Sequence, residues 1–227
     1  MPEHSYAYPA APSAQRASYG ALLSQTMFLV AVAIGFLVLG SYIGGGPGDA
    51  APLSQGAAMG CTIGGIVLLL AQNFVAPLRR GGGGMAVLFG VALLLGLGLG
   101  PALSHYVEVQ PDVVTKAAGT TALVVVAAGA GGTLVAKDLS PWMKPVSIIL
   151  LVAIAISWGT LIFGGVGGVG GDVLSLVIGA FSAVAIVVYF NVLRNRATDD
   201  DVIWIATGIF VGVVNIFVTL LNLFGGD

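Results

Sequence analysis

The stretch Val202–Phe224, VIWIATGIFVGVVNIFVTLLNLF, decides the fold. It contains no charged residue and, at ~1.5 Å per residue, is long enough as a helix to cross a hydrocarbon layer of ~30 Å. Its small and polar residues are spaced by four, three, four and three, which places them in one seam of that helix. We expect the seam to face the inside of a helix bundle in a membrane, with Asn215 and Asn222 pointing inward. The seam consists of Gly208, Gly212, Asn215, Thr219 and Asn222.

The composition is that of an integral membrane protein. Of the 227 residues, 57% are hydrophobic and only 8% are charged, against about 25% charged in a soluble domain. The net charge of −2 gives no basis for binding nucleic acid. A single cysteine, Cys61, rules out an internal disulfide, and no Cys or His spacing typical of a metal site occurs.

Seven apolar segments are long enough to span a membrane. Residues 1–21, rich in Pro, Ala and Ser, predict a flexible tail, and residues 22–227 predict one transmembrane domain. The first segment is longer than a signal-peptide core of ~7–15 residues, so we expect it to stay in the protein. The sequence therefore predicts an all-α membrane protein of seven helices. They are expected at about 22–43, 56–76, 85–103, 113–135, 146–163, 173–193 and 202–224.

The basic residues predict the orientation in the membrane. All but Lys116 fall in the tail or in every second loop. Short loops rich in Lys and Arg stay in the cytoplasm, so we expect a cytoplasmic N-terminus and an outward C-terminus. The residues on the expected cytoplasmic side are Arg16, Arg79, Arg80, Lys137, Lys144, Arg194 and Arg196.

Residues with evident chemistry are few. No Asp, Glu, Lys or Arg lies at the centre of a predicted span, although such residues commonly mark ion pathways. Amide side chains inside the predicted spans, among them Asn191, Asn215 and Asn222, either line a polar passage or form hydrogen bonds between helices. Each such hydrogen bond contributes ~0.6 kcal/mol. The expected loop after the third helix holds His105, Glu108 and Asp112, which form either a pH-sensitive, cation-attracting outer mouth or ordinary headgroup-level polarity.

Enzymatic and nucleotide-binding motifs are missing from the sequence. There is no GxSxG, no HExxH and no cysteine with a nearby base, so we expect no enzyme activity, no cofactor and no metal site. The GLGLG run at 96–100 lacks the spacing and the preceding strand of a nucleotide loop. We interpret its glycines as close helix packing.

Characteristic segments occur in order along most of the chain. They are SQTMFLVAVAIGFLVLGSYIGGG (24–46), LFGVALLLGLGLGPALSHY (88–106), PDVVTKAAGTTALV (111–124), VAKDLSPWM (135–143), VVYFNVLRN (187–195) and GIFVGVVNIFVTLLNLFGG (208–226). Together they resemble the Bax inhibitor-1 family, the transmembrane Bax-inhibitor-motif proteins, including its bacterial YccA-like branch. The resemblance implies a seven-helix fold with the seventh helix at its centre. It also favours a bacterial plasma membrane as the location.

For some members, the resemblance implies a calcium leak gated by two aspartates that bond to each other across helices six and seven. Here those two positions align with Asn191 and Gly212, neither of which titrates. We therefore expect that this aspartate latch does not operate. Restoring it with Asn191→Asp and Gly212→Asp is expected to introduce pH dependence.

Two functional hypotheses remain open. In the first, the protein is an ungated leak for calcium or another cation. Its passage runs along the side of the seventh helix that carries Asn215 and Asn222 and lies beside Asn191 of the sixth helix. In the second, it is a non-transporting regulator that binds a membrane protease or another membrane protein through its N-terminal tail and small-residue helix faces. Some bacterial relatives are thought to act in that way.

Overall fold

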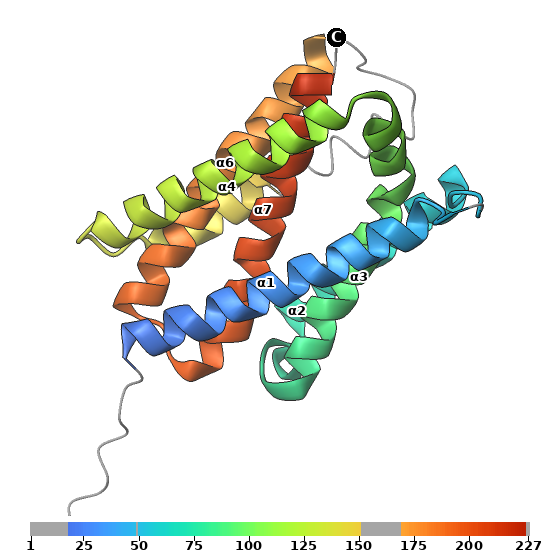
Figure 1. Cartoon of the computed structure of the whole chain (residues 1–227). Coiled ribbons are helices and arrows are strands. Elements are labelled where there is room, and N and C mark those ends of the chain that lie inside the picture. Colours follow the sequence, from blue (N-terminus) through green and yellow to red (C-terminus); the bar gives the residue numbers. More distant parts are fainter. Residues whose placement is uncertain (1–17, 49, 151–168, 226–227) are drawn as a thin grey trace, which may run out of the picture.

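The computed structural model describes residues 18–48, 50–150 and 169–225, and every long element among them is an α-helix (Figure 1). These helices are α1 (Tyr19–Gly44), α2 (Gln55–Phe74), α3 (Gly81–Val109), α4 (Pro111–Leu134), α6 (Val169–Asn195) and α7 (Val202–Gly225). Short 3₁₀ turns lie at Ala76–Arg79, Ser140–Trp142 and Asp199–Asp201. No strand occurs in the described ranges.

Six of these helices are long and apolar enough to cross a membrane. This confirms an all-α architecture with several membrane-spanning helices. Of the expected fifth span at 146–163, residues 146–150 are helical and the rest lie outside the described residues. The count of seven therefore stays a prediction. Residues 1–17 of the expected tail also lie outside the described part, and α1 begins at Tyr19, where the Ser18 hydroxyl caps it by accepting from the Ala21 amide.

The third helix is longer at both ends than the sequence predicted. Gly81–Gly84 form its first turn rather than a linker, and it continues past Pro101 to Val109. Only Gln110 separates it from α4, which starts with Pro111 at its first position, where proline's missing N–H costs nothing. The expected loop that holds His105, Glu108 and Asp112 is therefore wrong. His105 and Glu108 lie in the last turns of α3, and Asp112 lies in the first turn of α4.

Glycines bring α1 and α3 into close contact, as predicted for the GLGLG run. A Cβ added at Gly100 would lie 2.5 Å from the carbonyl carbon of Gly44. Likewise, a Cβ at Gly40 would collide with the Leu93 carbonyl oxygen, and one at Gly96 with that of Leu37. Such backbone contact is typical of small-xxx-small faces in membrane helices.

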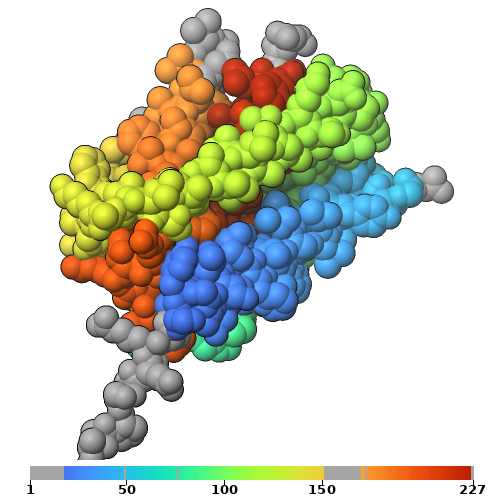
Figure 2. Space-filling model, turned by 60° about the vertical axis from the view of Figure 1, so that its left-hand side comes forward, coloured from blue at the N-terminus to red at the C-terminus, as the bar shows by residue number. Residues whose placement is uncertain are grey.

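The last helix is the most buried of the six. In its most apolar stretch 61% of the residues are buried, against 17% to 39% in the other five. It contacts α1, α3, α4 and α6, and Ile205, Ala206, Ile209 and Phe210 are fully buried. In the view of Figure 2, α1 and α4 both cross the molecule in front of α7. α7 therefore supplies much of the core of the described bundle.

Three connections meet at one end of the bundle, which we call the basic end. Arg80, after α2, pairs with Asp200, before α7, at 3.0 Å. Arg196, after α6, pairs with Asp138, after α4, at 2.8 Å. The alternate loops that carry the predicted cytoplasmic charges therefore lie together, as the alternation of basic residues requires.

Candidate functional site

The α7 seam faces α6. The Thr219 hydroxyl donates to the Ser175 carbonyl oxygen at 3.0 Å. Further toward the basic end, Gly212 lies against the Ile186 side chain and Gly208 against the Tyr189 ring. These contacts fix the register of an antiparallel pair, in which residue numbers across the interface rise on one helix as they fall on the other. The seam is thus half of a two-helix interface.

The other half is a row on α6 that the sequence analysis missed. It consists of Ser175, Gly179, Ser182, Ile186 and Tyr189, spaced by four, three, four and three. Gly179 lies against the Thr219 side chain, so the row matches the seam position by position. The same spacing that identified the seam was present in LSLVIGAFSAVAIVVY and could have identified the α6 row.

The end of the interface away from the basic end is polar. Ser175, Thr219 and Asn222, with Leu176 and Leu223, line a water-sized hollow of about 10 Å³. Asn222 is exposed there, so the expectation that it points inward is wrong. A straight helix drifts by ~20° per heptad, and Asn222 lies two heptads beyond Gly208, so the seam turns away from its partner at this end.

Two buried polar atoms without partners lie deeper in the interface. Ser182 is fully buried, and among the described residues its hydroxyl has no hydrogen-bond partner. The Nδ2 atom of Asn215 is likewise buried and has no partner within the described ranges. The α6–α7 register places these residues at about the same level. An unpaired polar group in a dry interior costs ~1–3 kcal/mol. These atoms are therefore candidates for contact with water or an ion inside the bundle.

Beyond Gly212 the interface becomes apolar and aromatic. Ile186 is fully buried, and the Tyr189 ring packs edge-to-face on Trp204 with centroids 5.8 Å apart. Tyr189 fills the space that a side chain at position 208 would need. The polar half of the interface is therefore separated from the basic end by packed side chains.

The predicted passage residue Asn191 is fully buried and makes four hydrogen bonds. Its Nδ2 donates to the carbonyl oxygens of Gly132, Val135 and Lys137 at 3.2, 2.8 and 3.1 Å. Its Oδ1 accepts from the Leu139 amide at 2.8 Å. The Gly132 carbonyl belongs to the last turn of α4 and the other two follow its end, where helices leave such groups unsatisfied. Asn191 therefore clamps the α4 end and residues 135–139 onto α6.

Asn191 and Gly212, the two positions expected to align with the aspartate pair, do not face each other. The α6–α7 register places Asn191 level with about Thr207, five residues and ~7.5 Å along the axis from Gly212. Thr207 itself accepts a hydrogen bond from Gln72 Nε2 on α2 at 3.3 Å. The structure therefore brings Gly208, Gly212, Asn215 and Thr219 to one interface with α6 and leaves Asn191 outside it.

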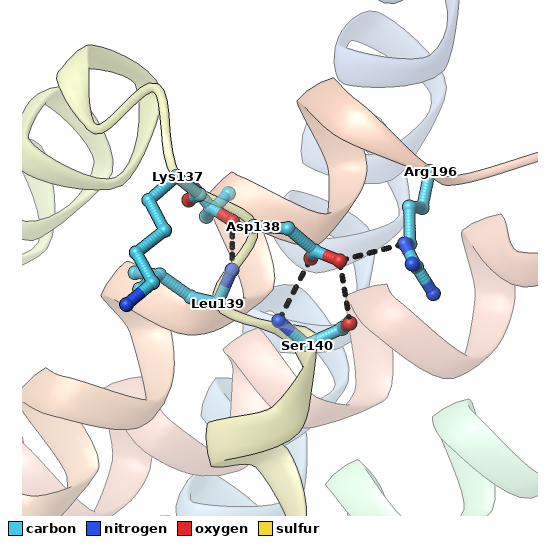
Figure 3. A network of polar contacts seen from close by, with 6 residues as sticks. Lys137, Asp138, Leu139, Ser140 and Arg196 are labelled. Atoms are coloured by element: carbon cyan, nitrogen blue, oxygen red, sulfur yellow. Dashed lines mark hydrogen bonds and ion pairs between the residues drawn. The ribbon is translucent and has the colours of Figure 1, made fainter.

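A second polar network holds the same connection from its exposed side (Figure 3). The Asp138 carboxylate accepts from the Ser140 amide at 2.9 Å and from its hydroxyl at 3.0 Å, and it pairs with Arg196. The backbone hydrogen bond from Ser140, more than the nearby Arg196 charge, lowers the pKa of Asp138. With Asn191, this network fixes residues 135–140 at two points.

The predicted outer mouth is divided by the structure. His105 and Tyr106 on α3 line a hollow of about 220 Å³ with Gln110 and Gly225. Glu108 and Asp112 are exposed and do not line it. Within residues 18–48, 50–150 and 169–225, no group of three His, Cys, Asp or Glu side chains could hold a metal ion.

The sequence matches a known protein family over nearly its whole length. A family model described as "Inhibitor of apoptosis-promoting Bax1" matches residues 13–227. The match includes all six described spans, together with the α6–α7 interface and the Asn191 clamp. The chain belongs to the Bax inhibitor-1 family and is a membrane protein with several apolar helices.

Proposed function

We propose that the protein is a weak cation leak whose passage follows the α6–α7 interface and works without an aspartate latch. The observation that supports this is the pair of buried, unpaired polar atoms, Ser182 Oγ and Asn215 Nδ2. Water entering from the polar end would satisfy both atoms. The Ser, Thr and Asn oxygens along this route are ligands that hard cations such as calcium accept.

The chemistry of this route sets the expected properties of the leak. It offers hydroxyl and amide groups and no carboxylate at Ser182, Gly212 or Asn215. Cation affinity is therefore weak, and flux changes little between pH 6 and 8. The basic end faces the cytoplasm of a bacterial plasma membrane in this proposal, since loops rich in Lys and Arg are retained there.

Calcium flux into dye-loaded proteoliposomes tests the proposal. Wild-type protein should exceed empty vesicles at pH 6, 7 and 8, and Ser182→Ala with Asn215→Leu should reduce flux to near background. The matched control is Asn73→Leu, which removes an exposed amide that bonds only within α2, to the Leu69 carbonyl. Wild-type flux equal to that of empty vesicles would refute the leak.

One observation favours the alternative of a regulator that binds a membrane protease or another membrane protein. Gly56 and Gly60 lie one turn apart on α2, and no atom of the described part of the chain lies within 4 Å of a Cβ added at either. Paired small residues of this kind allow close approach of a second helix. In this alternative, Gly60→Leu abolishes co-purification of the partner, and Gly35→Leu, at an equally open glycine on α1, does not. Co-purification that survives Gly60→Leu would count against it.

A further inference from the structure

The closed part of the α6–α7 interface depends on one aromatic side chain. Tyr189 lies against Gly208 through its Cζ, Oη and Cε2 atoms. No side chain at 208 competes for this space, and the edge-to-face contact with Trp204 holds the ring from the α7 side. The ring therefore occupies the seam at the level where the polar residues have ended.

The neighbouring positions distinguish this ring from ordinary packing. On its polar side the order is Ser175, Ser182 and Asn215, with only Ile186 against Gly212 in between. On its other side lie the Asn191 clamp and the ion-paired connections of the basic end. Apolar constrictions of this kind stop ions by excluding water.

We propose that Tyr189 is the constriction residue of the passage: its ring, seated on Gly208, closes the route and sets the size of cation that can pass. This inference rests on the proposed function and names the element that regulates it. The ring is the closing group, since it is the ring that fills the glycine gap and packs on Trp204. The hydroxyl is dispensable in this view.

Three substitutions separate this role from a general effect on the bundle. Tyr189→Ala removes the ring and should raise calcium flux about tenfold or more over wild type, a change equivalent to lowering a barrier by about 1.4 kcal/mol. It should also admit a larger organic cation such as choline. Tyr189→Phe keeps the ring and should behave as wild type. Tyr42→Ala is the matched control, since Tyr42 is 64% exposed on α1 and should leave flux unchanged.

The same vesicles distinguish failure of the constriction from failure of the passage. Wild-type flux that Ser182→Ala with Asn215→Leu abolishes, but Tyr189→Ala leaves unchanged, would overturn the constriction and leave the passage intact. If Tyr189→Ala also raises calcium flux in the Ser182→Ala, Asn215→Leu background, both the constriction and the passage are overturned, because the ions would then cross elsewhere. An equal increase in Tyr189→Phe would overturn the assignment to the ring. Each variant is compared only if it is folded, as judged by an α-helical circular dichroism spectrum and a monodisperse elution profile like those of the wild type.

Discussion

The Asn191 clamp gives the sharpest prediction about stability. Asn191→Asp keeps the size of the side chain but replaces its NH₂ group by an oxygen. The two hydrogens that now serve the carbonyl oxygens of Gly132, Val135 and Lys137 are lost, and a carboxylate oxygen meets those carbonyls instead. Leaving buried acceptors without donors costs ~1–3 kcal/mol for each group, whereas hydrogen bonds between membrane helices average ~0.6 kcal/mol.

Because three buried carbonyl oxygens lose a donor, and because the cost for each lies between these two values, we expect Asn191→Asp to lower the free energy of unfolding by about 2–4 kcal/mol. For a chain of this length, each kcal/mol corresponds to ~2–4 °C, so the melting temperature should fall by about 5–15 °C. The assay is thermal unfolding of the detergent-purified protein, followed by circular dichroism. Asn73→Asp is the control, because that amide is exposed and bonds only to the Leu69 carbonyl within its own helix.

A melting temperature of Asn191→Asp within about 1 °C of wild type would refute the clamp, because surface substitutions alone cost up to ~0.5 kcal/mol. The clamp also changes the expectation for the double variant Asn191→Asp, Gly212→Asp. The two positions lie at different levels of the α6–α7 interface, and Gly212 already contacts Ile186. We therefore now expect this variant to be destabilised rather than to acquire a pH-responsive pair.

Two further predictions concern the bundle and its basic end. Gly40→Ala should destabilise the protein by at least ~2 kcal/mol, because its Cβ would meet backbone atoms of α3 that cannot move independently. Gly35→Ala, at an open position of the same helix, should be neutral or stabilising by up to ~1 kcal/mol. Equal melting temperatures of the two variants would contradict the close packing of α1 on α3. The lowered pKa of Asp138 means that its ionised form stabilises the fold above the ordinary value of ~3.9, and that this contribution is lost as the pH falls through the lowered pKa. The difference in melting temperature between wild type and Asp138→Asn should therefore be constant from pH 5 to 8 and shrink below about pH 4; a difference that changes between pH 6 and 8 would contradict the assignment.

The fold was largely readable from the sequence because lipid restricts what a chain can do. Long uncharged runs can only be helices there, and the spacing of Gly208, Gly212 and Thr219 fixed which face of α7 meets another helix. The alternation of basic residues similarly anticipated that Arg80 and Arg196 would lie at one end. The third helix was misjudged because the glycine run at 81–84 was interpreted as a linker and the polar residues from His105 onward as a loop. A membrane helix tolerates glycines at its start and polar residues in its last turns when its neighbours pack closely.

The candidate site was less predictable, because it depends on which helix lies opposite. Asn191 has the same side chain whether it lines a passage or caps a carbonyl cluster, and only the position of residues 132–139 decides between these roles. Ser182 was overlooked because one hydroxyl in an apolar helix carries little signal until Asn215 is placed across from it. The aromatic Tyr189 gives no indication by itself that it seats on a glycine of α7.

Thiol accessibility along α7 tests most directly whether the α6–α7 interface holds water. Single cysteines at Asn222, Asn215 and Phe217 in a Cys61→Ala background would be exposed to a membrane-impermeant thiol reagent in intact proteoliposomes. Phe217 is the control at similar depth, since it is not part of the buried core or the seam. The account predicts fast reaction for Asn222→Cys, slower but complete reaction for Asn215→Cys and none for Phe217→Cys. No reaction at Asn215→Cys, or equal reaction at Phe217→Cys, would contradict a water-filled route between α6 and α7.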